Sequence, residues 1–242
     1  MERKQKTVIV TGASQGIGAG VVRAFLARGY NVVGTSRGAT KSRELSASAH
    51  LALIDGDIGR LETAQNVAQA ALHNFGTIDA VVANAGIFAV KRFTDYTPED
   101  LRAFVSTNLA GFIYVTQLAV RQMQVQRSGG SVVAITASLV ENPIAGVPVS
   151  VPMITKGGLE AALRSLASEY AKERIRFNAV APGIVDTPLH AEDPREFLET
   201  LSPMGAISTV DDIASAVVYL TEARQITGEV LHVDGGAHQG RW

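Results

Sequence analysis

The chain has 242 residues, 46% of them apolar and 19% charged, with a formal net charge of −1. This composition is typical of one globular domain rather than of a disordered chain, and the charge gives no electrostatic reason to expect nucleic acid or an anionic membrane as a partner. The absence of cysteine excludes disulfides, thiolate nucleophiles and cysteine-ligated zinc. The five histidines lack metal-ligand spacing. We therefore expect no metal site.

No apolar run approaches the ~18 residues that a membrane span needs, and no signal-peptide core follows the charged N-terminus. The sequence thus predicts a soluble cytoplasmic protein.

Short β-branched runs alternate with longer stretches of helical periodicity along the whole chain. The runs are almost continuously apolar, as parallel strands buried on both faces should be. The predicted strands are residues 7–11, 31–35, 51–55, 80–83, 131–135, 177–180 and 230–233, and the predicted helices are residues 16–28, 61–75, 98–126, 154–173 and 210–221. This alternation predicts a single α/β domain over residues 1–242, with a doubly wound seven-stranded parallel sheet and helices on both faces.

One region does not fit the alternation. Residues 183–203 are rich in proline and charge. They could form a disordered surface loop, or a lid at the carboxyl ends of the strands, where ligands bind in such folds. We favour the substrate lid.

A glycine-rich turn follows the first predicted strand and opens the first predicted helix. It consists of Thr11, Gly12, Ala13, Ser14, Gln15, Gly16, Ile17 and Gly18. Gly12 allows the tight turn, Gly16 lets the backbone approach a pyrophosphate, and Gly18 lets helix and strand pack closely. The helix N-terminus offers N–H groups and a positive dipole end to phosphates. Because a strand precedes this turn and a helix follows it, a dinucleotide site is favoured over a merely tight turn.

The end of the second strand indicates which dinucleotide. An acidic residue there would bind the ribose hydroxyls of NAD, but the chain has Ser36 and Arg37, with Lys41 and Arg43 close behind. Arg37 can pair with a 2′-phosphate, so NADP is predicted over NAD. The alternative is that Arg37 is simply solvated.

Further motifs in the same order make the chain resemble the short-chain dehydrogenase/reductase (SDR) family over nearly its whole length. They are Asp57-Ile58, Asn84-Ala85-Gly86, Asn108, Ser138, Lys156, the loop from Pro182 through Gly183 and Val185 to Thr187, and Val233-Asp234-Gly235-Gly236. The resemblance implies a Rossmann fold, a nicotinamide cofactor and an oxidoreductase. It implies catalytic roles for Asn108, Ser138 and Lys156. The cofactor residues that the turn and the resemblance together indicate are Gly12, Ser14, Gln15, Gly16, Ile17, Gly18, Ser36, Arg37, Asp57, Ile58, Asn84, Ala85, Gly86, Lys156, Pro182, Gly183, Val185 and Thr187.

One position departs from the family's pattern. The resemblance implies a tyrosine acid four residues before Lys156, where this chain has Pro152. Proline suits the start of a helix but has no proton to give. Three substitutes remain open: water held by Asn108 and Lys156, Glu141 if burial raises its pKa, and His190 in the lid. An activated acceptor such as an iminium ion would need no strong acid at all.

These observations predict an NADP(H)-dependent oxidoreductase with a non-standard proton donor. The proline-stiffened, apolar segment 141–153 favours a small, largely apolar carbonyl or imine-like substrate. The competing hypothesis is a non-catalytic NADPH-binding protein, either a sensor or an inactive partner subunit.

Apolar stripes on two long predicted helices bear on assembly. They comprise Val115, Leu118 and Gln122 on the first helix and Leu159, Leu163, Leu166 and Tyr170 on the second. In the resembled family these helices form dimer faces, so we predict a homotetramer of two-fold symmetry. The alternative is that the stripes belong to the core.

Overall fold

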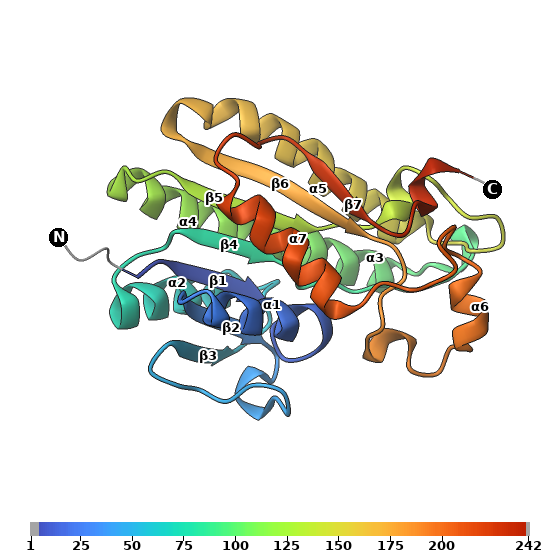
Figure 1. The fold of residues 1–242 in the computed structure, drawn as a ribbon, viewed down its shortest axis with the longest axis horizontal. Helices are drawn as coiled ribbons and strands as arrows, with labels where there is room; N and C mark the ends of the chain where they lie inside the picture. Colours follow the sequence, from blue (N-terminus) through green and yellow to red (C-terminus); the bar gives the residue numbers. More distant parts are fainter. Residues whose placement is uncertain (1–4, 241–242) are drawn as a thin grey trace.

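The computed structural model describes residues 5–240. Seven strands form one all-parallel sheet in the order β3-β2-β1-β4-β5-β6-β7, crossed by helices on both faces (Figure 1). The strands are β1 (Thr7–Thr11), β2 (Asn31–Ser36), β3 (Leu51–Asp55), β4 (Ala80–Ala83), β5 (Gly130–Ile135), β6 (Ile175–Pro182) and β7 (Val230–Val233). The predicted doubly wound α/β fold is confirmed, and all seven predicted strands are present.

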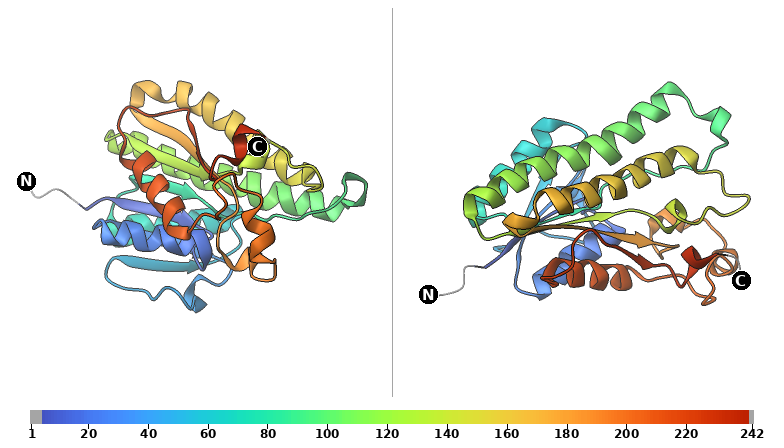
Figure 2. Two further views of the ribbon diagram at one scale, coloured as in Figure 1. Left: turned by 45° about the vertical axis from the view of Figure 1, so that its right-hand side comes forward. Right: turned by 90° about the horizontal axis from the view of Figure 1, so that it is seen from above.

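The helices are α1 (Gly16–Ala27), α2 (Leu61–Phe75), α3 (Pro98–Phe104), α4 (Gly111–Gln126), α5 (Ser150–Glu169), α6 (Arg195–Glu199) and α7 (Val210–Glu222). Helices α1 and α7 cover one face of the sheet, and α2, α4 and α5 cover the other, as the right-hand view of Figure 2 shows. Each layer buries its own apolar cluster against the sheet, with Phe25 and Ile213 in one and Phe112 and Leu163 in the other. The strands are apolar on both faces because both faces are covered.

The predicted helix 98–126 is divided into three parts. A π-helical turn, Val105–Ala110, separates α3 from α4. Asn108 lies in this turn. Its side-chain oxygen accepts from the backbone N–H of Ile87, and its side-chain nitrogen donates to the carbonyl of Ile87. Turns of this kind inside α-helices are frequently found at functional sites.

Helix α5 begins at Ser150, four residues before the predicted start, and ends at Glu169 rather than at Glu173. Pro152 is its third residue. The first four N–H groups of a helix have no intrahelical acceptor, so the N–H that proline lacks is not missed there. The three residues Ala171–Glu173 form a separate 3₁₀ turn.

The connection from β2 to β3 contains only a 3₁₀ turn, Ala39–Lys41, where parallel strands are usually joined by an α-helix. Two sets of contacts hold it in place. Thr40 donates to the Asp55 carboxylate from its backbone N at 2.8 Å and from its hydroxyl at 2.6 Å. Further on, the Ser42 hydroxyl donates to the Ser14 carbonyl at 2.7 Å. The second contact ties this connection to the glycine turn.

The region 183–203 has regular structure, with a 3₁₀ turn, Pro188–His190, followed by α6. Arg195 forms ion pairs with Asp186 and Glu199, and Leu198 is buried. Figure 1 shows α6 at the end of the molecule to which the strand arrows point. This region therefore lies at the carboxyl ends of the strands, where a lid would have to be.

The stripes that motivated the tetramer prediction belong largely to the core of one chain. Val115, Leu159 and Leu163 are buried in the cluster between the sheet and its covering helices, and Leu118, Leu166 and Tyr170 pack against it. The exposed apolar side chains of these helices are others, among them Ile113 on α4 and Ile154 on α5.

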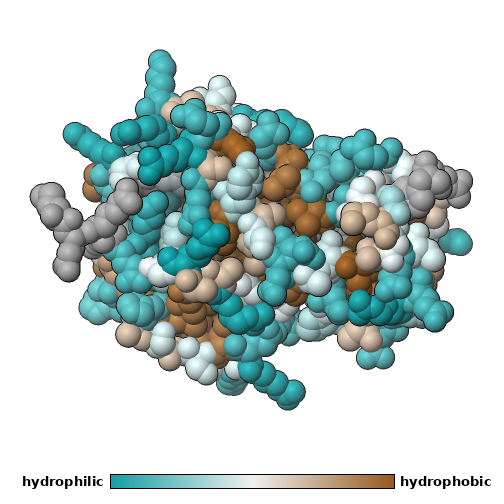
Figure 3. All heavy atoms as spheres, viewed as in Figure 1, coloured by the Kyte–Doolittle hydropathy of each residue, from teal (hydrophilic) through white to brown (hydrophobic). Residues whose placement is uncertain are grey.

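By length and mean hydropathy the helical segment Pro98–Gln126 could also cross a membrane, but 44% of its most apolar window is buried inside the protein. It packs on α2, β4 and β5 as a core helix does. On the face drawn in Figure 3, apolar side chains form separate patches among hydrophilic ones.

Candidate cofactor and reaction site

The glycine turn accepts no side chain at two of its positions. Gly12 has φ of +67°, and a Cβ there would lie 2.8 Å from Asn84 Nδ2. A Cβ on Gly18 would overlap the carbonyl oxygen of Gly12. The turn therefore packs directly against the start of α1, as the sequence predicts.

The turns after β1 and β4 are bound to each other. Asn84 Nδ2 donates to the carbonyls of Thr11 and Gly12 at 3.0 and 3.1 Å. In return the Thr11 hydroxyl accepts from the backbone N–H groups of Asn84 and Ala85 at 3.1 and 3.0 Å. The structure thus brings together two segments that lie about seventy residues apart in the sequence.

Helix α1 has no cap from its own N-cap residue, Gln15, although the Glu44 side chain accepts a hydrogen bond from Gly16 N at 3.2 Å. The N-terminus of a helix offers further N–H groups and a positive dipole end, which can bind anions. Together with the side-chain-free cradle of Gly12 and Gly18, this end of α1 fits the phosphates of a dinucleotide.

The predicted nicotinamide-side loop reaches the same turn. Gly183 N donates to the Val233 carbonyl at 3.1 Å, and a Cβ on Gly183 would lie 2.8 Å from the Asp234 side chain. At the far end of the loop, Thr187 Cγ2 lies 3.4 Å from the position of a Cβ on Gly16. The side chain of Val185 is buried in the core, so only its backbone can face a ligand.

Three residues predicted at the adenosine end differ in exposure and in hydrogen bonding. Arg37 is exposed, and its guanidinium makes no hydrogen bond or ion pair within residues 5–240. Asp57 is also exposed, although its carboxylate already accepts from Gly59 N at 2.9 Å. Ile58 is buried against Gly111 of α4. Ile58 therefore packs the segment after β3 against α4.

Lys156 lies on α5 with its ammonium group inside the protein. Nζ donates to the carbonyl of Ile135, the last residue of β5, at 2.6 Å, and the residue is only 8% exposed. Burial lowers the pKa of Lys156 to about 8, because desolvation disfavours the charged form. No carboxylate offsets that effect.

Asn108 is held on the same side of the site. Its Oδ1 accepts from Ile87 N at 2.8 Å, and its Nδ2 donates to the Ile87 carbonyl and to Thr155 Oγ1 at 3.2 and 3.0 Å. Both amide protons are thereby used within the protein. Asn108 Oδ1 and Lys156 Nζ lie 3.4 and 3.1 Å from the position of a Cβ on Gly86. An oxygen acceptor and an ammonium donor therefore meet beside this glycine.

Pro152 is buried one helical turn before Lys156. Its carbonyl accepts from the Thr155 hydroxyl at 2.8 Å, and Thr155 in turn accepts from Asn108. The side chain of Pro152 has no polar atom, so the only groups it presents to the site are methylenes. Ser138 is buried at the start of a 3₁₀ turn, Ser138–Val140, directly after β5.

Two of the three substitute acids suggested by the sequence are engaged elsewhere. The Glu141 carboxylate lies 3.4 Å from His232 Nε2, and the His232 ring stacks on His238 at 3.9 Å between centroids. His190 Nδ1 lies 2.8 Å from the carboxylate of Asp193, within the region 183–203. Within residues 5–240, neither side chain makes a hydrogen bond or ion pair with Lys156 or Asn108.

The sequence reading missed one buried carboxyl group. Glu160 lies one turn after Lys156 on α5 and is 2% exposed, and burial raises its pKa. Its Oε1 has no hydrogen-bond partner among the described residues. Glu160 is four residues after Lys156, so both side chains lie on the sheet-facing side of α5. This spacing is the one sequence feature that could have indicated that Glu160 is buried.

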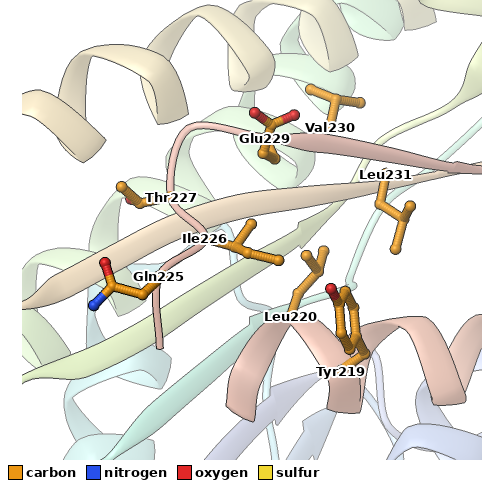
Figure 4. Close-up of a pocket in the computed structure, with 8 residues that line it drawn as sticks. All are labelled: Tyr219, Leu220, Gln225, Ile226, Thr227, Glu229, Val230 and Leu231. Carbon is orange, nitrogen blue, oxygen red and sulfur yellow. The ribbon is translucent and has the colours of Figure 1, made fainter. Parts of the chain in front are cut away.

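One surface hollow does not belong to this site. It has a volume of about 400 Å³ and lies between the end of α7 and the start of β7, lined by residues such as Tyr219 and Ile226 (Figure 4). That is the amino end of the last strand, opposite the glycine turn. In the part of the chain that the structure describes, no cluster of side chains could hold a metal ion.

A sequence model of the family described as Enoyl-(Acyl carrier protein) reductase matches residues 12–238. The chain belongs to the short-chain dehydrogenase/reductase family. This SDR protein is 34% identical to L-rhamnose 1-dehydrogenase (NAD(P)(+)) of Azotobacter vinelandii, over 96% of each chain. It is 35% identical to carbonyl reductase family member 4 of Xenopus tropicalis, over 96% of this chain and 97% of that one.

Solved SDR structures agree with the fold throughout. The 3-ketoacyl-(acyl-carrier-protein) reductase of Brucella melitensis complexed with NADH superposes with a TM-score of 0.90 at 26% identity, over 96% of this chain and 98% of that one. ElxO with NADP bound gives a TM-score of 0.88 at 28% identity, over 97% and 99%. The SDR protein described here is therefore an oxidoreductase that uses a nicotinamide cofactor.

Proposed function

We propose that this protein is an NADP(H)-dependent reductase of a small, largely apolar carbonyl or imine-like substrate, in which Lys156 replaces a phenol as the source of the proton. The observation that carries the proposal is a buried ammonium group with a proline, not an acid, one helical turn before it. The bound cofactor supplies the hydride. The chain's own residues must supply orientation and the proton.

The roles follow from the contacts at the site. Lys156 binds the nicotinamide ribose and keeps an ammonium proton beside Gly86, where Asn108 Oδ1 retains one lone pair for a relay water. Ser138 orients the acceptor oxygen or nitrogen. Because both protons of Asn108 Nδ2 are used within the protein, the relay water donates to Asn108 and accepts from Lys156.

The pKa of Lys156 suits this role. A general acid works best when its pKa lies near the operating pH, and burial brings Lys156 to about 8. An unperturbed lysine would hold its proton too tightly. The same burial that weakens the ammonium group as a charge makes it a better proton donor.

The preference for NADP rests on Arg37. Its guanidinium is free at the end of β2, and Ser36 before it carries no charge that would repel a 2′-phosphate. Lys41 and Arg43 add positive charge along the same connection.

The substrate class is proposed from the side chains at the carboxyl ends of the strands. Within the lid and the segment that follows it, Leu189, Phe197 and Met204 are 62%, 55% and 79% exposed. The segment 141–153 is largely apolar and contains three prolines. A lid that exposes this much apolar surface gains most by closing on an apolar ligand.

The experiment is NADPH oxidation by the wild type and by Pro152→Tyr, each with one simple ketone and one preformed iminium ion. The wild type should reduce the ketone slowly and the iminium faster. Pro152→Tyr should raise ketone turnover by less than the ~10²–10⁴ that general acid catalysis can contribute. Rapid ketone reduction by the wild type, with no gain in the variant, would show that a competent acid is already present.

The missing phenol also supports a second candidate, a non-catalytic NADPH-binding protein. That protein would bind NADPH but oxidise it with neither acceptor, in either variant. The same two assays therefore separate the two functions.

We further propose a cytoplasmic homotetramer. Leu101, Ile113 and Ile154 are 48%, 44% and 60% exposed on α3, α4 and α5, and β7 is a half-buried edge strand. Symmetric association would cover both surfaces. A monomeric mass by light scattering at micromolar concentration would refute this assembly.

A further inference from the structure

The cap of α1 comes from outside the helix. Gly16 N donates to Oε1 of Glu44 at 3.2 Å, and the other carboxylate oxygen accepts from Arg23 Nη1 at 2.8 Å. Arg23 lies two helical turns along α1 from Gly16, so the carboxylate is held at two points of the same helix face. A carboxylate that is ion-paired with Arg23 therefore lies on the turn that the SDR fold uses for its cofactor.

The position of Glu44 is set by its own segment. The Ser42 hydroxyl donates to the Ser14 carbonyl and accepts from the N–H groups of Glu44 and Leu45 at 3.1 and 3.2 Å. Leu45 is buried in the core beneath. These contacts fix the backbone around Glu44, and its side chain is held by Gly16 N and Arg23.

This segment approaches from the adenosine side. It belongs to the connection that leaves β2 at Ser36 and Arg37, and the missing crossover helix lets it fold back onto Ser14. The cations Arg37, Lys41 and Arg43 and the carboxylate of Glu44 are thus carried by one short connection. A 2′-phosphate bound by Arg37 would therefore lie on the same connection as that carboxylate.

We propose that Glu44 is a specificity-determining residue of the cofactor site, which opposes Arg37 by placing a negative charge beside the 2′-phosphate position. The effect is electrostatic and lies at a partly exposed site, so it should be modest and should weaken with salt. It rests on the proposed binding of the adenosine moiety at this connection. It does not depend on turnover.

The test is binding of 2′,5′-ADP and 5′-AMP to the intact protein, measured by calorimetry for the wild type and Glu44→Gln. The amide keeps an oxygen for Gly16 N–H and removes only the charge. The ratio of the 5′-AMP to the 2′,5′-ADP dissociation constant should rise about two- to fivefold, the size of one charge at a helix N-terminus. The rise should shrink at high ionic strength.

Glu222→Gln is the matched control. Glu222 forms an ion pair with Arg28 at the other end of α1. Glu222→Gln changes the net charge of the protein by the same amount as Glu44→Gln. The control should leave the ratio unchanged. Equal changes for both ligands in Glu44→Gln, or no change in either, would overturn the proposal. Failure of the wild type to bind either ligand would instead refute the cofactor site itself.

Discussion

The glycine turn and the reaction end of the site lie at the same edge of the sheet but depend on different contacts. At the turn, backbone atoms and absent side chains define the shape, through Gly12, Gly18 and the Asn84 amide. At the reaction end, buried side chains do so, through Lys156 and Asn108. The glycine turn therefore tolerates almost no substitution. At the reaction end, one side chain can be replaced while the others keep their positions.

The reason lies in what supports Lys156 and Asn108. Lys156 is held by the carbonyl of Ile135, and Asn108 by Ile87 and Thr155. None of these contacts requires a side-chain polar atom at position 152. The lysine and the asparagine are therefore held beside Pro152 without any polar side-chain atom at that position.

The largest effect should follow from Lys156→Met. Ketone turnover should fall by at least ~10², because the proposed proton source is removed. The fold should persist, and the free energy of unfolding should rise, since a buried charge with one hydrogen bond is replaced by an apolar side chain of similar length. Urea unfolding and steady-state kinetics measure both, with the exposed Lys172→Met as control. Loss of folding in Lys156→Met would contradict this account.

Gly18→Ala should break the turn. The new Cβ would overlap the Gly12 carbonyl, so the backbone must shift, at a cost of about 1–3 kcal/mol or more in stability. NADPH affinity should fall with it. Gly38→Ala is the control, because nothing lies within 4 Å of a Cβ there. Thermal unfolding and fluorescence titration with NADPH check the pair, and equal behaviour of the two variants would refute the close packing.

The stability of the protein should depend on Lys156 at alkaline pH. The folded pKa is about 8 and the unfolded value about 10.5, so between them the unfolded chain binds more protons. The contribution of Lys156 should therefore make stability rise with pH over that window, by roughly 3–4 kcal/mol at most. The difference between wild type and Lys156→Met in urea unfolding at successive pH values isolates it. A difference that does not change with pH would mean that the ammonium group is not desolvated.

Arg37→Ala sharpens the comparison at the adenosine end. The affinity for NADPH should fall about tenfold, the scale of one charge-assisted contact, while that for NADH stays the same. Titration of the cofactor by protein fluorescence measures both. If the unaltered protein binds NADPH and NADH equally, Arg37 does not select the cofactor.

The sequence predicted the sheet well because the strands are buried on both faces and read as continuous apolar runs. Helix boundaries were less predictable. The break between α3 and α4 depends on Asn108 reaching the backbone of Ile87, a contact that no local pattern reveals. The start of α5 was placed too late, although Pro152 fits the first turn of a helix.

The site was predictable where backbone geometry demands particular residues, as at Gly12 and Gly18. It was less so where burial decides the chemistry. Neither the carbonyl partner of Lys156 nor the burial of the Glu160 carboxyl can be predicted from spacing, because both depend on which atoms the fold removes from water. The contact of Glu44 with Gly16 arises from tertiary folding of a connection that has no regular pattern.

The claim that Lys156 supplies the proton is tested most directly by the pH dependence of kcat for ketone reduction with saturating NADPH. For the wild type, kcat should be level at lower pH and fall about tenfold per pH unit above about 8, as Lys156 loses its proton. Reduction of a preformed iminium ion, which needs no proton, should show no such fall. A wild-type ketone rate that stays constant through pH 8 would contradict the account and assign the proton to another group.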